Sequence, residues 1–253
     1  MKKIAFYLIA TGVFFAACRK ETTFKQTASP EKKVQSVHYS SSTGTAFSSY
    51  YAYDNTGKLK ELKHKNETET FTYSSPYSFA VKTTNDSDPT IFTTDIYTLN
   101  NKGAVEKMET LYANGSIFSI TRFTYDTDNI LKVRETEYPQ QNKIFRFEYS
   151  ITDKLKTAQS FFINNVLQSR EEYSYDISRP LKGLGQLNTN NYFPGLYGED
   201  QQFPLAGIKF FDAAGNLQEN RSYTSVHDEQ GYIISYSGNN LISNNTFTCQ
   251  FNY

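Results

Sequence analysis

The sequence contains no tryptophan and only two cysteines among its 253 residues. Cys18 follows an apolar N-terminal segment, and Cys249 lies near the opposite end of the chain. If the apolar segment is a signal, Cys249 is the one cysteine left to the folded domain, and an internal disulfide is excluded. We therefore expect Cys249 to pack as a small apolar side chain.

An excess of one charge sign is also absent, because 26 basic residues balance 26 acidic ones. Nucleic-acid-binding domains carry a basic surplus, so we expect no nucleic-acid partner. The sequence also lacks an apolar run of about twenty residues, which is the length that a transmembrane helix requires. Its longest such run, residues 4–15, is shorter than that.

Sequence motifs of common catalytic sites are absent as well. The chain has no Gly-x-Ser-x-Gly, no His-Glu-x-x-His and no phosphate-binding loop. Its three histidines, His38, His64 and His227, are far apart and do not have the spacing of metal ligands. We therefore expect no catalytic residues, no cofactor and no metal, and a protein that is not an enzyme.

Paired acidic residues leave two alternatives open. Glu135 and Glu137 share one face of a predicted strand, about 6.6 Å apart by strand rise, which is near the carboxylate spacing of inverting glycosidases. A carboxylate-dependent glycoside hydrolase is therefore the enzymatic alternative. Two further pairs have a composition that suits a weak calcium site, although turn formation also explains them: Asp86 with Asp88, and Asp126 with Asp128.

The first residues predict an export signal. Lys2 and Lys3 precede the apolar run, and small residues follow it. The sequence Phe-Ala-Ala-Cys that ends at Cys18 resembles a bacterial lipobox, which implies a signal peptide at residues 1–17 and an acylated Cys18. Residues 18–36 are polar and predict a flexible tether. By resemblance to known sorting signals, Arg19 implies the outer membrane, and Lys20-Glu21 resembles a shortened cell-surface signal.

A short motif recurs along the rest of the chain. It has an aromatic or apolar residue, then Asp, Asn or Ser, and three positions later Gly, Asn or Asp, followed after one further residue by an aliphatic residue. Its copies are YDNTGKL at Tyr53, LNNKGAV at Leu99, YDTDNIL at Tyr125, YSITDKL at Tyr149, FDAAGNL at Phe211 and HDEQGYI at His227. The second and fifth positions suit a type I turn followed by a left-handed residue, which is a common hairpin loop. The motif therefore predicts turns.

The segments between these turns alternate apolar and polar residues, as in KIFRFEYS at residues 143–150. Such alternation is typical of antiparallel strands with one buried face. We predict an all-β fold at residues 37–253, an antiparallel up-and-down meander of about a dozen strands that forms a strongly curled sheet or barrel.

One copy of the motif is interrupted by an insert. After Tyr175-Asp176, Arg179 and Pro180 replace the turn residues, and a stretch without alternation follows at residues 182–206. A loop of this length is usually functional or disordered, and its aromatic content argues against disorder. It serves either as a lid over one end of the sheet or as a binding surface, for which the candidate residues are Tyr192, Phe193, Tyr197 and Phe203.

The Tyr-Asp turns loosely resemble the YD repeats of Rhs-type and teneurin-type shells. Together with the lipobox and the Pro-containing break after Tyr175-Asp176, they more closely resemble uncharacterised Gram-negative envelope lipoproteins of about this length. That resemblance covers most of residues 37–253. It implies a porin-like, barrel-like β domain and an envelope location, and it carries over no catalytic residue.

A barrel embedded in the outer membrane is the remaining alternative. The C-terminal FTCQFNY ends on an aromatic residue, as such barrels do, but predicted strands such as AVEKMETLY carry charge on both faces. We therefore expect a lipid-anchored outer-membrane lipoprotein, exposed at the cell surface if the Lys20-Glu21 signal acts, with a non-catalytic binding or structural role. Its expected partners are the membrane, through the lipid, and a glycan, a peptide or another envelope protein.

Overall fold

A computed structural model describes residues 32–178, 180, 182, 196–198 and 202–253 of the chain. Its strands are β1 (Ser36–Ser41), β2 (Ala46–Tyr53), β3 (Leu59–His64), β4 (Glu67–Ser75), β5 (Ser78–Asn85), β6 (Phe92–Leu99), β7 (Val105–Tyr112), β8 (Ile117–Tyr125), β9 (Leu131–Tyr138), β10 (Lys143–Thr152), β11 (Leu155–Ile163), β12 (Val166–Tyr175), β13 (Leu205–Asp212), β14 (Leu217–His227), β15 (Ile233–Asn240) and β16 (Thr246–Asn252). In the described residues the only helical turn is η1 (Pro139–Gln141), between β9 and β10.

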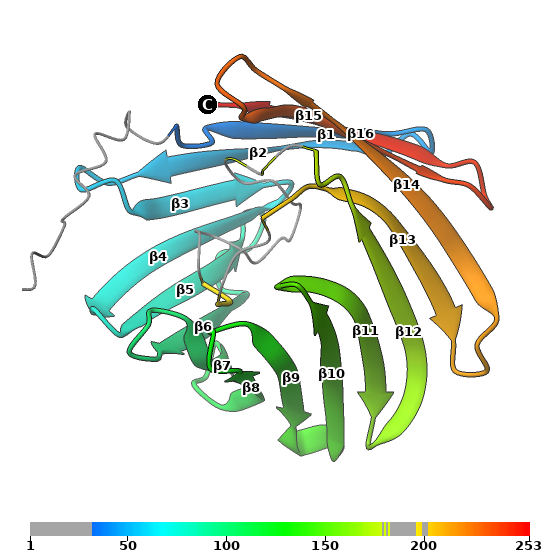
Figure 1. Ribbon diagram of the computed structural model, residues 1–253. Helices are drawn as coiled ribbons and strands as arrows, with labels where there is room; N and C mark the ends of the chain where they lie inside the picture. Colours follow the sequence, from blue (N-terminus) through cyan, green and yellow to red (C-terminus); the bar gives the residue numbers. More distant parts are fainter. Residues whose placement is uncertain (1–31, 179, 181, 183–195, 199–201) are drawn as a thin grey trace, which may run out of the picture. The chain divides into compact units, whose positions relative to one another are not determined.

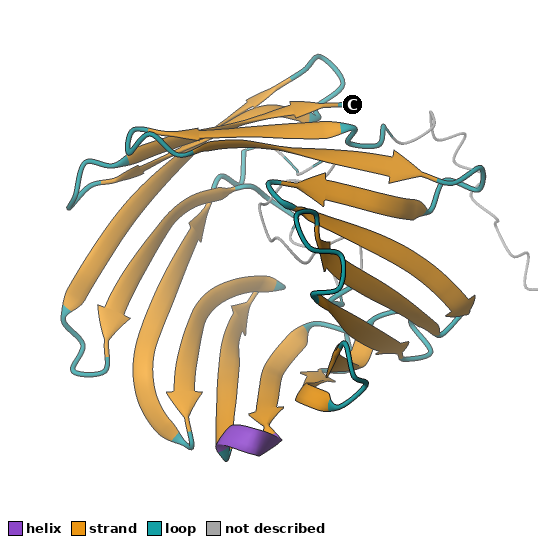
Figure 2. Ribbon diagram, turned by 180° about the vertical axis from the view of Figure 1, so that it is seen from behind, coloured by secondary structure: helices purple, strands orange, loops and turns teal. Residues whose placement is uncertain are grey.

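Each strand pairs antiparallel with the next one in sequence, and β1 pairs with β16, so the sheet closes into a barrel (Figure 1). The closing ladder runs from Ser36 opposite Asn252 to Ser41 opposite Phe247. Figure 2 shows that strands and short loops make up nearly all of the described chain. No helix in the described part of the chain is long and apolar enough to cross a membrane.

The predicted all-β meander is confirmed, with sixteen strands rather than about a dozen. The difference arises because some hairpins turn without the motif. β3 and β4 are joined by residues 65–66, and β4 and β5 by residues 76–77. Such short connections contain no glycine, so two strands and their turn resemble one continuous stretch in the sequence.

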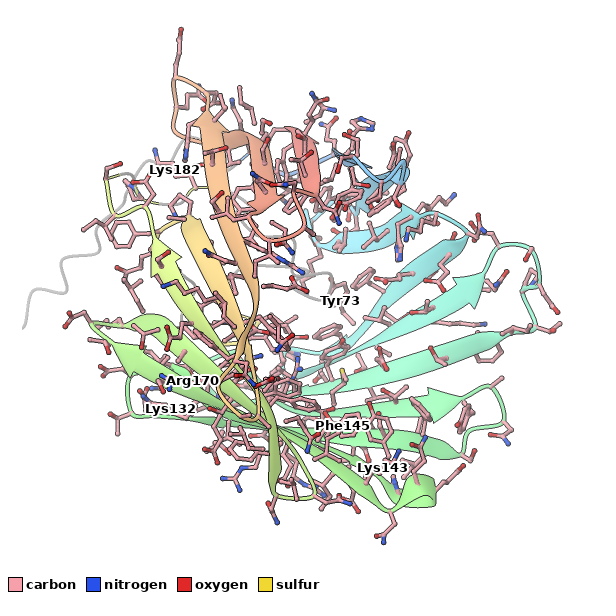
Figure 3. The ribbon with its side chains drawn as sticks, turned by 90° about the vertical axis from the view of Figure 1, so that its right-hand side faces the viewer. Tyr73, Lys132, Lys143, Phe145, Arg170 and Lys182 are labelled. Atoms are coloured by element: carbon pink, nitrogen blue, oxygen red, sulfur yellow. The ribbon has the colours of Figure 1, made fainter. Side chains whose placement is uncertain are left out.

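The turns lie at two opposite ends of the barrel. We call the end with the turns 54–58, 100–104, 126–130 and 228–232 the motif rim, and the end with the turns 42–45, 113–116 and 213–216 the far rim. Figure 3 views the barrel from the side, with Lys132 and Lys182 towards the motif rim and Lys143 and Phe145 towards the far rim. The copy of the motif at Phe211 thus turns the chain at the far rim.

The predicted turn chemistry is confirmed in detail at residues 54–58. The Gly57 amide donates to the Asp54 carbonyl (3.0 Å), and the Asp54 amide donates to the Lys58 carbonyl (2.8 Å). Gly57 has φ +82°, and Asn129 takes the same place in its turn with φ 64°. The fifth motif position therefore supplies the left-handed residue that the loop requires.

The copy at Tyr149 is the exception. Ser150 lies within β10, and the chain turns on two residues, Asp153 (φ 51°) and Lys154 (φ 64°). Two successive left-handed residues are typical of a type I′ hairpin turn. Tyr149 pairs with Gln159, whereas Tyr53 pairs with Leu59 next to its own turn. Tyr149 therefore lies farther from the rim than the other motif aromatics.

Buried apolar side chains gather in the half of the barrel next to the motif rim. One cluster consists of Leu59, Leu62, Phe71, Phe79, Val81, Tyr97, Val105, Phe123 and Leu196. The other consists of Val34, Val37, Leu205, Ile233, Tyr236, Cys249 and Phe251. Towards the far rim the inward-facing aromatics, such as Phe47, Phe145 and Phe210, are only half-buried. Solvent therefore reaches the inner surface from the far rim.

Ordered packing begins before the expected domain start at residue 37. The compact unit covers Lys32–Tyr253. Val34 is buried in the second cluster, and the Gln35 amide donates to the Asn252 carbonyl (2.7 Å). The last residues of the expected tether thus extend the strand pairing of β1 with β16.

Candidate functional site

Five tyrosines near the motif rim hold neighbouring strands together: Tyr53 and Tyr125 from intact copies of the motif, Tyr175 from the interrupted copy, and Tyr73 and Tyr253 from outside it. Each of the five donates its hydroxyl to a backbone carbonyl at or near the start of a neighbouring strand, a role that the sequence pattern did not reveal. The bonds join Tyr53 to Val34 (2.8 Å), Tyr73 to Leu59 (2.9 Å), Tyr125 to Val105 (2.6 Å), Tyr175 to Lys156 (2.6 Å) and Tyr253 to Ile233 (2.9 Å). The strand register shifts beside Tyr53, Tyr125 and Tyr175, so the ring fills an irregular part of the ladder.

The insert opens as another copy of the same turn. The Ser178 amide donates to the Asp176 carboxylate (3.0 Å), as Thr56 does to Asp54 (2.8 Å). The Asp176 amide donates to the Pro204 carbonyl (2.9 Å), so the hairpin closes across the whole insert. β13 begins at Leu205, and the expected insert at residues 182–206 therefore ends before its predicted boundary.

Residues 196–198 of the insert dock at the motif rim. Leu196 is fully buried, and its carbonyl accepts a hydrogen bond from the Val105 amide (2.8 Å). Gly198 forms an antiparallel bridge with Ile130 and has φ +91°. A Cβ atom at Gly198 would lie 2.2 Å from the Asn129 carbonyl oxygen. Only glycine allows this close approach.

The docked segment places Tyr197 against the inner surface, with its ring centroid 5.4 Å from that of Phe123. Burial raises the pKa of Tyr197 to about 12, while nearby Arg134 and a hydrogen bond with Tyr97 lower it. Phe203 is half-buried. Tyr192 and Phe193, the other two candidate binding residues, lie outside the described residues, as does Cys18.

A charged group of side chains lines the inside of β9–β12. Inward-facing positions follow from the register, in which Phe123, Arg134, Phe147 and Phe161 lie opposite one another on β8 to β11. We call Arg134, Tyr149, Lys156, Glu171 and Tyr173 the inner polar cluster. It contrasts with the buried apolar side chains of β3–β8, which we call the apolar sector.

The cluster is built on aromatic rings. The Lys156 ammonium lies 4.3 Å from the ring centroid of Tyr173 and 5.3 Å from that of Tyr149. The Arg134 guanidinium lies 4.2 Å from the ring centroid of Phe147, and Phe147 stacks on Phe161 at 4.7 Å. Glu171 accepts a short hydrogen bond from the Tyr173 hydroxyl. Such cation–π contacts stabilise desolvated cations.

Lys156 occupies a place that is taken by an aliphatic residue in the equivalent hairpins. Of the five residues whose carbonyls receive a motif-rim tyrosine hydroxyl, Val34, Leu59, Val105 and Ile233 are buried apolar residues. Lys156 is the fifth. The two-residue turn at 153–154 sets the register in which Ile151 pairs with Lys156. This register brings Lys156 to the position whose carbonyl accepts a tyrosine hydroxyl.

Burial and charge tune these groups. Burial lowers the pKa of Lys156 to about 8, while Glu171 raises it and Arg134 lowers it further. Burial, together with the neighbouring Glu171 carboxylate, raises the pKa of Tyr173 well above its ordinary value. The cluster therefore combines an ammonium and a guanidinium group with one carboxylate and with phenols whose pKa values burial raises.

Both cations lack an acceptor among the residues that the structure describes. The buried Nε atom of Arg134 has no hydrogen-bond partner there. No hydrogen bond or ion pair joins the Lys156 ammonium to a described residue, although Lys156 as a whole is half-buried. Another inward-facing cation, Arg221, has an acceptor, since its side chain donates to Glu219 (2.7 Å). The inner polar cluster is therefore the strongest candidate site in the described chain.

The acidic pairs considered from the sequence have structural roles. Glu137 lies on the outer surface, 3.4 Å from Arg122, and Glu135 pairs in register with Arg122 and Arg146 on the same surface. The Asp126 carboxylate accepts the Asp128 and Ile130 amides (3.0 and 2.9 Å) within its turn. The hydrogen bonds from Ile130 and Asp128 lower the pKa of Asp126.

The other turn residues likewise engage their own loops. The Asp88 carboxylate accepts the Thr90 amide (3.1 Å). His227 contacts the Gly231 carbonyl (3.2 Å) and the Ser225 hydroxyl (2.9 Å) within its hairpin. No group of three or more His, Cys, Asp or Glu side chains in the described residues is placed to hold a metal ion.

Comparison with known proteins shows the fold. No protein-family model matches the sequence, and no curated protein is similar to it. A porin-like protein from Bacteroides uniformis has a similar structure, with a TM-score of 0.58 and 15% identity over 88% of this chain and 97% of that one. A porin-like protein from Bacteroides vulgatus gives a TM-score of 0.64 and 11% identity over 88% of this chain and 99% of that one.

Proposed function

We propose that the chain is a lipid-anchored envelope protein whose barrel stands in water and binds a ligand without catalysing a reaction. The observation that carries this proposal is the polar outer surface of the barrel. The lipobox ending at Cys18 supports the anchor. The similarity in fold to porin-like proteins supports an envelope location.

Ion pairs lie on the outer surface of β3, β7, β8 with β9, β10 and β12. The two partners sit two residues apart on one strand, except for Arg122 and Glu137, which are diagonal neighbours on adjacent strands. The pairs are Glu61 with Lys63 (3.3 Å), Lys107 with Glu109 (2.9 Å), Arg122 with Glu137 (3.4 Å), Arg146 with Glu148 (2.8 Å) and Arg170 with Glu172 (3.4 Å). A Lys or Arg on the lipid side at the bilayer midplane costs about 2–4 kcal/mol. These pairs therefore favour a barrel surrounded by water.

The apolar side chains support the same proposal. A membrane-embedded barrel presents its apolar residues to lipid and its polar residues to the interior. In this chain Phe247, Cys249 and Phe251 of the last strand belong to or pack against a buried inner cluster. The terminal aromatic, Tyr253, donates its hydroxyl to the Ile233 carbonyl. The sequence feature that resembled an embedded barrel thus contributes to the core.

The positions of the acidic residues support a binding role over hydrolysis. Glu135 and Glu137 lie on the open outer surface among Arg122 and Arg146. A glycosidase needs its two carboxylates on either side of a bound sugar bond, with one of them raised in pKa. The inner surface, with its rings and the docked Tyr197, offers the better binding surface.

The test is release from the membrane. The full-length chain should require detergent for extraction, and Cys18→Ala should be soluble without detergent while keeping its β-sheet circular dichroism. Residue Cys249 provides the matched control, because Cys249→Ala should leave membrane attachment unchanged. A Cys18→Ala chain that still requires detergent would show that the barrel itself is embedded and would overturn the proposal.

A further inference from the structure

We propose that the inner polar cluster binds an organic anion, with a carboxylate or phosphate group held by Arg134 and Lys156 and a ring-sized body against the neighbouring aromatic rings. This inference rests on the proposed function, because it takes the barrel interior as the binding surface. It adds the chemical class of the ligand and the residues that select it.

Charge is the first reason. Glu171 is the carboxylate of the cluster, and its short hydrogen bond is with the Tyr173 hydroxyl rather than with either cation. Lys156 and Arg134 therefore contribute a net positive charge to this part of the interior. Two other inward carboxylates are engaged, since Asp95 accepts the Thr110 hydroxyl (2.6 Å) and Glu219 pairs with Arg221.

Unused hydrogen-bond donors are the second reason. A guanidinium group presents donors in a planar fork that suits a carboxylate or phosphate. The Arg134 fork has no acceptor in the described chain, and its Nε atom is buried. A buried donor without an acceptor costs free energy, which a bound anion recovers. Lys156 adds donors from the adjacent part of the same surface.

The surrounding rings indicate what the anion is attached to. Phe147 and Phe161 stack at 4.7 Å beneath Arg134, and Phe145 extends this row at 5.7 Å from Phe161. All three rings are half-buried and face the interior that opens at the far rim. Rings of this kind bind the flat faces of sugars and aromatic groups. The surface therefore suits an acidic sugar, a sugar phosphate or an aromatic acid.

The final reason for proposing anion binding is that Lys156 stands where the equivalent hairpins have an apolar residue. The position of Lys156 is apolar at Val34, Leu59, Val105 and Ile233, so the fold accepts a buried aliphatic residue there. A buried cation is less favourable for stability than an apolar side chain of similar volume. A stabilising apolar residue is thus replaced by a cation beside a second cation, which is the arrangement that anion binding requires.

The experiment uses the full-length chain in detergent and isothermal titration calorimetry. The probes are trigalacturonate as the carboxylate source, glucose 1-phosphate as the phosphate source and neutral galactotriose. We expect at least one anionic probe to bind and galactotriose not to bind. Arg134→Gln and Lys156→Met should each weaken anion binding at least about tenfold.

Matched controls lie on the outer surface of neighbouring strands. Arg146→Gln and Arg170→Gln remove the same charge from β10 and β12 but lie away from the interior. They should change anion affinity less than about twofold. Melting temperatures of all variants identify any that fail to fold, and Arg134→Lys then provides a second variant, which keeps the charge but loses the fork and should bind more weakly than wild type.

A pH titration provides an independent readout. The groups that face Lys156 are Arg134 from β9, Tyr149 from β10, and Glu171 and Tyr173 from β12. Because burial lowers the pKa of Lys156 to about 8, anion affinity should fall as the pH rises through this value. The Lys156→Met chain should lose this dependence.

Two results would overturn the inference. One is that neither anionic probe binds at concentrations up to about 10 mM, and the other is that the outer variants weaken binding as much as the inner ones. Both leave membrane release of Cys18→Ala unaffected, so failure of this inference is distinguishable from failure of the proposed function.

Discussion

The apolar sector and the inner polar cluster are built from the same repeating hairpins, yet their interiors differ. In the apolar sector Leu59 and Val105 are buried beneath the tyrosines that bind their carbonyls. At the polar cluster Tyr175 binds the Lys156 carbonyl in the same way, but a cation takes the buried place. The same turn and tyrosine hydrogen bond thus occur in both regions, while the inward residue beside them differs, and we propose that this difference serves binding.

The largest expected effect tests the apolar sector. Phe79 is 2% exposed and stacks on Tyr97 with ring centroids 4.4 Å apart. Phe79→Ala should lower the free energy of unfolding by about 3–5 kcal/mol. Phe161→Ala, near the polar cluster, should cost about half as much because that ring is half-buried. Urea denaturation followed by circular dichroism measures both, and equal losses would remove the distinction between the two regions.

Substitutions of glycine test whether docking of the insert at residues 196–198 stabilises the apolar sector. Gly198→Ala combines a left-handed φ with a contact at 2.2 Å to the Asn129 carbonyl oxygen, so it should destabilise the chain by about 2–3 kcal/mol. Gly215 has φ +86° and nothing within 4 Å of an added Cβ, and Gly215→Ala should cost about 1 kcal/mol because alanine is less stable than glycine in the left-handed region. Protease cleavage near residue 198 should increase only in the first variant. Equal behaviour of the two would mean that docking adds no stability.

Lys156→Met should stabilise the barrel, in contrast to the two preceding changes. The folded pKa of Lys156, about 8, lies below its ordinary value of 10.5. The folded chain therefore binds this proton less tightly than the unfolded chain, and the ammonium opposes folding at neutral pH. We expect a gain of about 1–3 kcal/mol at pH 7.

The pH dependence of stability tests whether the Lys156 ammonium opposes folding. If it does, the free energy of unfolding of the wild-type chain should rise from pH 8 towards pH 9.5, as Lys156 loses its proton. The advantage of Lys156→Met should shrink over the same interval. Thermal unfolding at several pH values measures this difference. A destabilised Lys156→Met chain would mean that the ammonium is well compensated within the folded barrel.

The smallest expected loss of stability concerns the tyrosine hydrogen bonds that both regions contain. Tyr125→Phe removes the hydroxyl that binds the Val105 carbonyl (2.6 Å), and Tyr175→Phe removes its counterpart at Lys156 (2.6 Å). Each should cost about 1 kcal/mol. Tyr112→Phe is the control, because Tyr112 is exposed and its hydroxyl has no hydrogen bond with the described residues. Losses at Tyr125 and Tyr175 that match the control would show that these hydrogen bonds do not stabilise the rim.

The sequence predicts the parts of this structure that depend on local chemistry. Asp54 and Gly57 specify a turn wherever they occur in the motif, so the turns and the all-β meander follow from the pattern. The predicted number of strands was too low because some turns, such as the one at residues 65–66, contain neither glycine nor the turn motif. Closure of the barrel depends on the pairing of β1 with β16, which no local signal specifies.

The candidate site was harder to predict because it depends on register. The motif aligns Leu155 with the aliphatic residues Leu59 and Val105. The two-residue turn at 153–154 shortens the hairpin and brings Lys156 to the tyrosine-bound position instead. A one-residue change in register exchanges the two faces of a strand. Of the predicted site residues that the structure describes, Tyr197 lies beside the polar cluster.

The pairing of β1 with β16 has a consequence for folding kinetics. Every other strand pair joins neighbours in sequence, so most of the sheet forms from local contacts, which fold fast. Ser36 meets Asn252 only when the last residues of the chain are present. During synthesis β1 therefore waits as an open edge, and chaperones that bind exposed strands have their longest opportunity at this strand.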